Sequence, residues 1–488
     1  MRASLASSIA VACAAALALP VTLVAPATAT ARPAANALPP AQDELPGSTQ
    51  SLPLRPLGAS VRSFGDPGSV REQGLDRRDV RPFSLVGVVW DDPAAELRGT
   101  VQVRTRATAD GVWSPWQDVE THNEEHGADP ESAEGAAGTL RGSTAPLWVG
   151  DSDGVEIRVR AEEGAPDGTE DGAPDGTTEG AAERAPKART VTAPLPAGLR
   201  LELVDPGEEP ATAPAPGTRA MAPPAVLTAA EAAASSANSQ LAPYGSTEIP
   251  AAPRDDTVAA PVHETAAEPP AAQPAAAPVQ EAAAKKPYIG PRPKIITRKG
   301  WGADETIREK GFVYTKTIKA AFVHHSATGN NYTCGQAPSV LRGIYRYHVK
   351  SSGWRDFGYN FAVDKCGNIY EGRAGGVAKP VLGAHTLGFN TNSMGVAVLG
   401  TFTSSTPPAA AVTAVARLTA WKLGLHGIDP KGTQTLVSGG GNLYAKGRKV
   451  RFHTIAGHRD GFATDCPGGR LYNKLGTARA SSAKYQGR

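Results

Sequence analysis

The sequence predicts an α/β domain, with a central mixed β-sheet flanked by helices, over residues 293–482. A separate, mostly β domain is expected over residues 53–207, and a disordered Ala/Pro-rich linker over residues 208–292 is expected to join the two. Three observations favour this division. Short strand patterns fill the first region, strand and helix patterns alternate in the last, and the segment between them has almost no aromatic residues with which to build a core.

The first of the expected strands in this N-terminal region is rich in residues that favour β-structure, and in the other three apolar residues alternate with polar ones. The expected strands are Phe83–Trp90, Thr100–Arg106, Val155–Arg160 and Leu199–Leu203. Short strands separated by Gly- and Asp-rich turns favour a β-sandwich over a helical fold. An acidic insert, in which Gly-Ala-Pro-Asp-Gly occurs twice, is expected to form a disordered loop over about residues 164–188.

Four tryptophans fall in this first region, namely Trp90, Trp113, Trp116 and Trp148. Exposed aromatic rings could stack on sugar rings, whereas buried tryptophans would fill the core of a small β domain. Core packing is the commoner arrangement, and the sequence leaves both open.

After Lys294 the predicted elements alternate between strands and helices. Strands are expected at residues 319–324, 395–399 and 452–456, a hairpin at 360–371, and helices at 338–350, 407–425 and near 471–475. Pro338 in the first turn and Gly353 beyond the end delimit the first helix. Thr406 is the expected N-cap of the second helix.

The first 31 residues have the pattern of an export signal. Arg2 supplies a positive start, Ile9–Val24 is an apolar run, and Ala27-Thr28-Ala29 fits a small-residue cleavage site, so that cleavage is expected after Ala29 or Ala31. A membrane anchor is less favoured, because Pro20 interrupts the run and no basic cluster follows it. No other segment is long and apolar enough to span a bilayer. We therefore expect a secreted protein, extracellular or associated with the cell wall, in a compartment that permits disulfides.

The charge of the chain argues against a nucleic-acid partner. The formal net charge of the 488 residues is only +2, and no long run of Lys or Arg occurs. We expect a monomer without a membrane span.

Two histidines and one cysteine of the last region form a candidate metal site. His324 ends an expected strand, and Cys466 follows eight residues after His458. Two imidazoles and one thiolate bind Zn²⁺ and leave the fourth tetrahedral position for water, as in catalytic rather than structural sites. The alternative is that each histidine is an ordinary polar residue with a satisfied hydrogen bond.

The cysteine count supports the metal interpretation. The chain has four cysteines, and Cys13 would leave with the export signal. Cys334 before a helix and Cys366 in a hairpin turn suit a disulfide, which leaves Cys466 unpaired. In the chain-entropy model, closing that loop contributes about 3–4 kcal/mol. Metal ligation would explain an unpaired thiol in an oxidising compartment.

Several further motifs, in order along the chain, complete the pattern of the last region. They are Gly300-Trp301-Gly302, His324-His325-Ser326-Ala327-Thr328, Tyr347-His348, Asp356-Phe357-Gly358-Tyr359-Asn360-Phe361, Tyr370-Glu371-Gly372-Arg373, Gly383-Ala384-His385-Thr386, Gly457-His458-Arg459-Asp460 and Thr464-Asp465-Cys466-Pro467-Gly468. With them, residues 294 to about 480 resemble the peptidoglycan recognition protein family, which shares its fold with type 2 N-acetylmuramoyl-L-alanine amidases. The region before residue 208 resembles, more weakly, the N-terminal domain of secreted actinobacterial members.

The resemblance implies a role for each matched residue. His324, His458 and Cys466 match the zinc ligands, and His325 is expected to pack or to form a hydrogen bond beside the site. Tyr359 and Thr464 match the positions that assist catalysis.

The substrate groove is matched less specifically. His348, Arg373, His385 and Asn390 match groove positions, although such polar residues often serve only the fold. After Arg373 this chain has Ala374-Gly375-Gly376 instead of the Gly-Trp of animal members, so the shape of the groove there cannot be carried over.

The resemblance implies zinc-dependent hydrolysis of the amide bond between N-acetylmuramic acid and L-alanine, with peptidoglycan as the partner. The first alternative is a peptidoglycan-binding protein with little or no catalysis. Family members that lose the cysteine ligand bind without cutting, whereas this chain keeps it. The second alternative keeps the zinc and cuts within the stem peptide.

Overall fold

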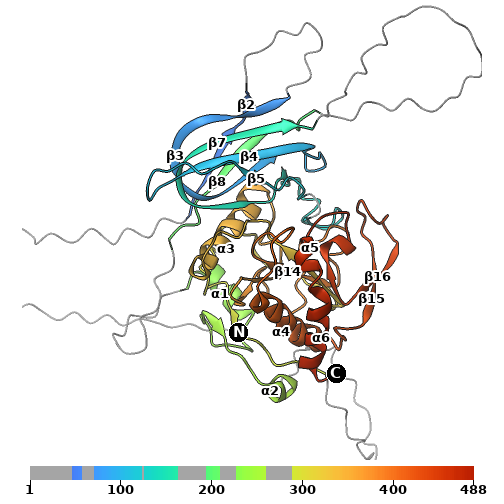
Figure 1. The fold of residues 1–488 in the computed structure, drawn as a ribbon. Coiled ribbons are helices and arrows are strands. Elements are labelled where there is room, and N and C mark those ends of the chain that lie inside the picture. The colour runs from blue at the N-terminus through green and yellow to red at the C-terminus, as the bar shows by residue number, and fades with distance from the viewer. Residues whose placement is uncertain (1–46, 58–70, 124–125, 163–193, 209–226, 260–287) are drawn as a thin grey trace, which may run out of the picture. The chain divides into compact units, whose positions relative to one another are not determined.

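A computed structural model of the chain describes residues 47–57, 71–123, 126–162, 194–208, 227–259 and 288–488 (Figure 1). The expected export signal and the expected loop at 164–188 lie outside these residues. Among the described residues, no helix combines the length and the apolar character needed to cross a membrane.

The N-terminal domain is built around one antiparallel sheet. Its strands are β1 (Thr49–Pro53), β8 (Arg200–Val204), β3 (Glu72–Trp90), β7 (Leu147–Ala161), β4 (Gly99–Ala107) and β5 (Gln117–Val119), in that spatial order, and β2 (Arg55–Pro56) and β6 (Gly142–Ser143) also pair with β3. The expectation of a sandwich is therefore corrected, because these strands form one connected sheet. The long strands β3 and β7 pair with three shifts in register, and such irregularities bend a sheet so that it can enclose its own core.

The tryptophans of this domain divide into two pairs. Trp90 and Trp148 are buried in hydrophobic clusters, which confirms core packing for these two. Trp113 and Trp116 are partly exposed, and the guanidinium group of Arg104 lies over both rings. Carbohydrate binding by this pair stays a hypothesis.

The C-terminal domain has the predicted central mixed sheet. Its strands are β17 (Ile455–Gly457), β11 (Ala320–His325), β14 (Ser393–Val398), β12 (Phe361–Val363), β13 (Ile369–Glu371), β10 (Ile295–Ile296) and β9 (Glu248–Ile249), in that spatial order. Strand β11 runs parallel to both neighbours, whereas β12 and β13 form the predicted antiparallel hairpin. Strands β15 (Thr433–Val437) and β16 (Lys449–His453) form a separate antiparallel pair.

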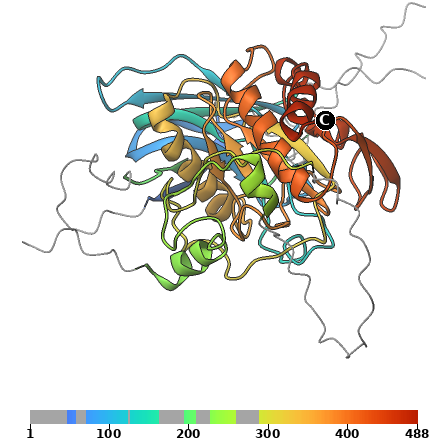
Figure 2. The same ribbon diagram turned by 90° about the horizontal axis from the view of Figure 1, so that it is seen from below.

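Helices cover both faces of this sheet. Successive residues of a strand point to opposite sides of a sheet, so neighbouring residues of one strand pack against different helices. Val396 and Val398 of β14 pack in the same cluster as α4 (Ala409–Leu425) and α6 (Leu475–Gln486), and these two helices lie side by side (Figures 1 and 2). Ala397, between the two valines, packs on the other face with α3 (Ala337–Arg346).

Three expected element boundaries are corrected. Helix α4 begins after Pro408, and not after Thr406, since each proline disfavours the helical conformation in the residue before it. The strand expected at 452–456 divides into β16 and β17, with Thr454 between them. The short C-terminal helix is two helices, α5 (Gly469–Tyr472) and α6.

The expected linker is corrected over residues 227–259. Thr228 and Glu231 form a capping box that begins α1 (Ala229–Ser236), β9 pairs with β10, and α2 spans Arg254–Ala259. Ile249 is fully buried, and burial of this side chain, together with pairing along β10, favours order in a segment whose composition predicts none. The rest of the expected linker, residues 209–226 and 260–287, lies outside the described part of the chain.

The N-terminal and C-terminal domains share a hydrophobic cluster. Leu85 and Val89 of β3 and Trp148 of β7 pack in one cluster with Val340 and Ile344 of α3. The close approach also involves polar groups, since the hydroxyl of Tyr347 lies 3.2 Å from the carbonyl oxygen of Val88 and 3.1 Å from that of Thr144. A side chain at Gly87 would collide with the Tyr347 ring, so this contact requires glycine there.

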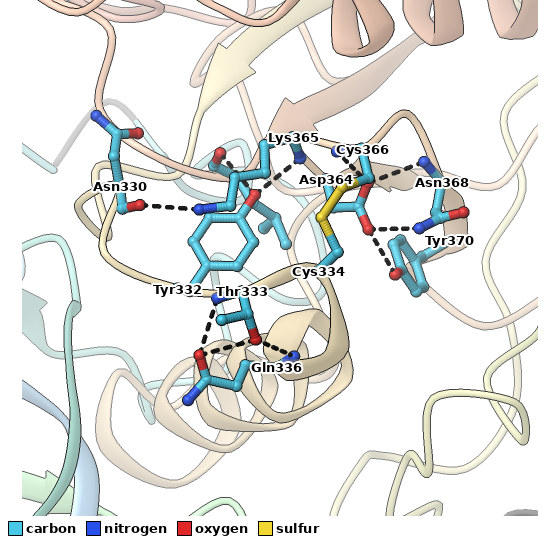
Figure 3. The surroundings of a disulfide bond; sticks show 11 residues. Asn330, Tyr332, Thr333, Cys334, Gln336, Asp364, Lys365, Cys366, Asn368 and Tyr370 are labelled. Carbon is cyan, nitrogen blue, oxygen red and sulfur yellow. Dashed lines mark hydrogen bonds between the residues drawn. A yellow bond between two sulfur atoms is a disulfide. The ribbon is translucent and has the colours of Figure 1, made fainter.

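The predicted disulfide between Cys334 and Cys366 is present and joins the start of the α3 region to the β12–β13 turn (Figure 3). Asp364 organises that turn. Its carboxylate accepts hydrogen bonds from the backbone N–H groups of Cys366 and Asn368, each at 2.9 Å, and from the Tyr370 hydroxyl at 2.9 Å. Among the described cysteines Cys466 forms no disulfide, as predicted, and its side chain is buried.

Candidate metal centre and substrate groove

The three predicted metal ligands meet at the ends of two neighbouring strands. His324 lies near the end of β11, and His458 follows directly after β17, which is parallel to β11. Their ring centroids are 4.5 Å apart. The Sγ atom of Cys466 lies 3.8 Å from Nδ1 of His324, and all three side chains are buried.

A fourth potential ligand comes from the N-terminal domain and was missed by the sequence interpretation. Nε2 of His126 lies 3.7 Å from Sγ of Cys466, and its ring centroid is 4.5 Å from that of His458. One ligand atom from each of the four residues lies within 4.8 Å of the other three. No motif surrounds His126 in the sequence, so nothing there distinguishes it from an ordinary polar residue.

The donor set fits zinc. Tetrahedral Zn²⁺ with nitrogen and sulfur ligands places neighbouring ligand atoms about 3.3–3.8 Å apart, and the two distances from Sγ of Cys466 to histidine nitrogens, 3.7 and 3.8 Å, agree with this range. Burial lowers the pKa of His126 to about 3 and that of His324 well below its usual range. Neutral imidazole is the form that binds metal. Nε2 of His324 also lies 3.5 Å from the Thr386 hydroxyl, which helps to orient the ring.

Tyr359 and Thr464 lie beside this cluster. The Tyr359 ring is buried, with its centroid 5.2 Å from that of His324 and 5.8 Å from that of His126. The hydroxyl of Thr464 accepts a hydrogen bond from the backbone N–H of Cys466 at 3.1 Å. Both residues line the small cavity next to the metal ligands. His325 accepts a hydrogen bond from the backbone N–H of Phe402 at 3.3 Å, in agreement with the role expected for it.

Two of the four predicted groove residues are held by contacts within the C-terminal domain. Nδ1 of His348 accepts a hydrogen bond from the backbone N–H of Gly358, and the ring stacks on Trp354. His385 is fully buried, with its ring centroid 5.3 Å from that of His324. No hydrogen-bond partner for Nε2 of His385 is found among the described residues.

The other two predicted groove residues contact the N-terminal domain. Arg373 forms a buried, two-point ion pair with Glu134, at 2.7 and 3.0 Å. Nδ2 of Asn390 donates hydrogen bonds to the carbonyl oxygen of Gly127 at 2.8 Å and to the carboxylate of Asp129 at 2.9 Å. The structure therefore brings Arg373 and Asn390 together with one segment that lies more than 200 residues earlier in the chain.

Two family models match the chain. Residues 314–469 match the N-acetylmuramoyl-L-alanine amidase family, and residues 33–192 match the family described as Rv3811 N-terminal galactose-binding domain-like.

Several similar proteins come from animals. Peptidoglycan-recognition protein SC2 of Drosophila simulans is 29% identical over 185 residues, which are 38% of this chain and 85% of that protein. Human N-acetylmuramoyl-L-alanine amidase is 31% identical over 189 residues, 38% of this chain but only 28% of the human protein. A solved structure, peptidoglycan recognition protein-LE in complex with tracheal cytotoxin, has 28% sequence identity and a TM-score of 0.31, and the match covers 38% of this chain and 92% of that one.

The family match covers the strands and loops that carry His324, Tyr359, His458 and Cys466. The C-terminal domain of this chain belongs to the family of peptidoglycan recognition proteins and type 2 N-acetylmuramoyl-L-alanine amidases.

Proposed function

We propose that the protein is a zinc-dependent amidase that hydrolyses the bond between N-acetylmuramic acid and L-alanine in peptidoglycan. The observation that carries the proposal is the buried cluster of His324, His458 and Cys466, with Tyr359 beside it, in a domain of the amidase family. The names of the relatives, which include both an amidase and peptidoglycan-recognition proteins, support peptidoglycan as the substrate.

His324, His458 and Cys466 would hold the metal through two neutral imidazoles and one thiolate. When bound there, Zn²⁺ would supply a Lewis acid and a water of lowered pKa. The overall reaction breaks the C–N bond. The hydroxyl of water joins the lactyl carbonyl carbon, and the amino group of L-alanine leaves with the proton.

Tyr359 and Thr464 would act on the oxygen of the amide carbonyl, where negative charge develops. The phenol of Tyr359 is held in a buried site, so its O–H group can donate a hydrogen bond to that oxygen with little reorganisation. The Thr464 hydroxyl can donate a second hydrogen bond but carries no charge. Most of the electrostatic stabilisation therefore depends on what the metal site holds.

The main alternative is a protein that binds peptidoglycan with little or no hydrolysis. Cys466 and Tyr359 favour hydrolysis, since recognition of a muramyl peptide requires neither a thiolate ligand nor a buried phenol beside it. An endopeptidase that cuts within the stem peptide would use the same metal cluster on a different bond.

The sequence also supports action outside the cell. The first 31 residues have the composition of an export signal, and one disulfide joins Cys334 to Cys366. A secreted enzyme, extracellular or associated with the wall, would meet peptidoglycan there.

Mass spectrometry of the products tests the proposal. The zinc-loaded full chain is incubated with soluble muramyl peptides, beside the same chain stripped of metal and a sample to which zinc has been restored. We expect free stem peptides that begin with L-alanine, formed only when zinc is present. Fragments cut within the stem peptide would identify an endopeptidase, and binding without any product would favour the recognition protein.

A further inference from the structure

We propose that His126 is a fourth protein ligand of the metal and that residues 126–134, here called the closing segment, cover the substrate groove, so that the full chain is a latent enzyme. The inference rests on the proposed zinc amidase function. It adds that the N-terminal domain controls whether the metal centre is open.

The first support is the position of His126 at the metal cluster. Its ring packs edge-on against His458 and also lies next to Tyr359, so it contacts both the metal ligands and the residue that would assist catalysis. A catalytic zinc site has three protein ligands and one position for water, whereas a site with four protein ligands is closed. His126 would therefore take the position that the reaction needs.

The second support is the space that remains at the cluster. His126 is buried, and the cavity that it lines together with Tyr359, Thr464 and Cys466 has a volume of about 10 Å³. That volume holds about one water molecule. A muramyl peptide cannot enter until the closing segment has moved.

The third support is the set of polar contacts along the closing segment. Glu134 pairs with Arg373 through both carboxylate oxygens and accepts a further hydrogen bond from the backbone N–H of Arg355 at 3.1 Å. Asp129 accepts hydrogen bonds from Asn390 and from the backbone N–H of Gly388. An anionic group of a substrate would have to displace these two carboxylates to reach the same donors.

The fourth support comes from described residues that lie several positions before and after the closing segment and contact the rest of the protein. After it, the Thr139 hydroxyl donates a hydrogen bond to the carbonyl oxygen of Gly353 at 3.0 Å, and the backbone N–H of Arg141 donates to Ser352 at 3.1 Å. Before it, β5 ends at Val119 in the sheet of the N-terminal domain. The segment is thus anchored at its base by both domains and projects its one cluster histidine to the metal site.

The metal coordination of the full chain can be read with Co²⁺ in place of Zn²⁺. Three proteins are compared: wild type, His126→Ala, and His453→Ala as a control, in which an exposed histidine outside the cluster is lost. Azide binds Co²⁺ only at an open position. We expect azide to change the visible spectrum of the His126→Ala protein and to leave the other two unchanged. A chelator should also remove the metal from His126→Ala about tenfold faster or more.

The second measurement is the rate at which each protein hydrolyses a soluble muramyl peptide. Opening the site should raise the rate of the zinc-loaded His126→Ala protein about 10–100-fold over wild type, because the competent fraction then increases. Glu134→Gln keeps all four ligands and removes the charge that pairs with Arg373. It should raise the rate by a smaller factor, with an unchanged Co²⁺ spectrum.

Each outcome bears on one claim. Azide binding to the wild-type protein as strong as to His126→Ala, or equal rates in wild type, His126→Ala and Glu134→Gln, would overturn the closing role. If azide binds only His126→Ala but no protein cuts any amide, the fourth ligand stands and the proposed amidase function fails.

Discussion

The two halves of the candidate site differ in the origin of their contacts. The metal ligands His324, His458 and Cys466 come together through strands and loops of one domain. The groove residues Arg373 and Asn390 instead contact Glu134, Asp129 and Gly127 of the N-terminal domain. The three ligands proposed to carry the chemistry therefore all come from the amidase-family domain, whereas the fourth potential ligand, His126, and the state of the groove half depend on the N-terminal domain.

This difference separates the effects of substitutions on the hydrolysis step from their effects on access of the substrate to the groove. Loss of His324, His458 or Cys466 should abolish the reaction, whatever the position of the closing segment. Changes in the N-terminal domain should alter how much of the protein is open and leave the chemistry intact. Three substitutions sharpen that comparison.

Cys466→Ser should have the largest effect. A serine hydroxyl is a poor zinc ligand in place of a thiolate, so we expect metal content to fall far below one ion per chain and hydrolysis to fall to background. Metal analysis after gel filtration, together with the product assay, measures both. Continued cleavage by this variant would refute the metal site.

Tyr359→Phe should have the next largest effect, on turnover alone. The change keeps the buried ring and every metal ligand and removes one hydrogen-bond donor to the transition state. We expect kcat to fall on the order of 10²–10³-fold, with little change in metal content or substrate affinity. Tyr288→Phe, at an exposed position, is the matched control. Full activity in Tyr359→Phe would remove the role assigned to the phenol.

Leu85→Ala should have the smallest effect on chemistry and tests the contact between the domains. Leu85 is fully buried in the shared cluster with α3, so its truncation should lower the free energy of unfolding by about 2–5 kcal/mol. Leu75→Ala removes a leucine that is buried within the N-terminal domain only.

Guanidinium chloride denaturation, followed by tryptophan fluorescence, compares these two leucine variants. Of these two leucines, Leu85 alone packs in the cluster shared by the domains. Leu85→Ala, but not Leu75→Ala, should therefore also loosen the closing segment over the groove and raise the rate of hydrolysis. Equal rates in the two variants would indicate that the shared cluster does not hold the closing segment in place.

The sequence predicts the elements whose pattern is local. Strands β11 and β14, the β12–β13 hairpin and the cores of α3 and α4 follow from periodicity and from turn residues. The two-residue strand β9 does not, because Glu248 and Ile249 lie in an Ala/Pro-rich segment and their order comes from pairing with β10. Local secondary-structure propensity does not predict a strand whose hydrogen bonds come from a distant strand.

Prediction of the candidate site from the sequence has the same limit. His324, His458 and Cys466 can be predicted because they lie in motifs within one domain. The contacts of Arg373 and Asn390 cannot, since their partners are set by how the two domains pack. His126 has no motif around it, and its place in the metal cluster appears only when residues 198 positions apart in the sequence, His126 and His324, are seen in contact.

In the full chain we expect three histidines and one cysteine to surround the metal. The most direct test is NMR of the full chain loaded with ¹¹³Cd and labelled with ¹⁵N in histidine, which counts the histidines through one-bond coupling to the metal. We predict three coupled imidazoles in the wild-type protein and two in His126→Ala. Only two coupled imidazoles in the wild-type protein would contradict the account, because the metal centre would then be open.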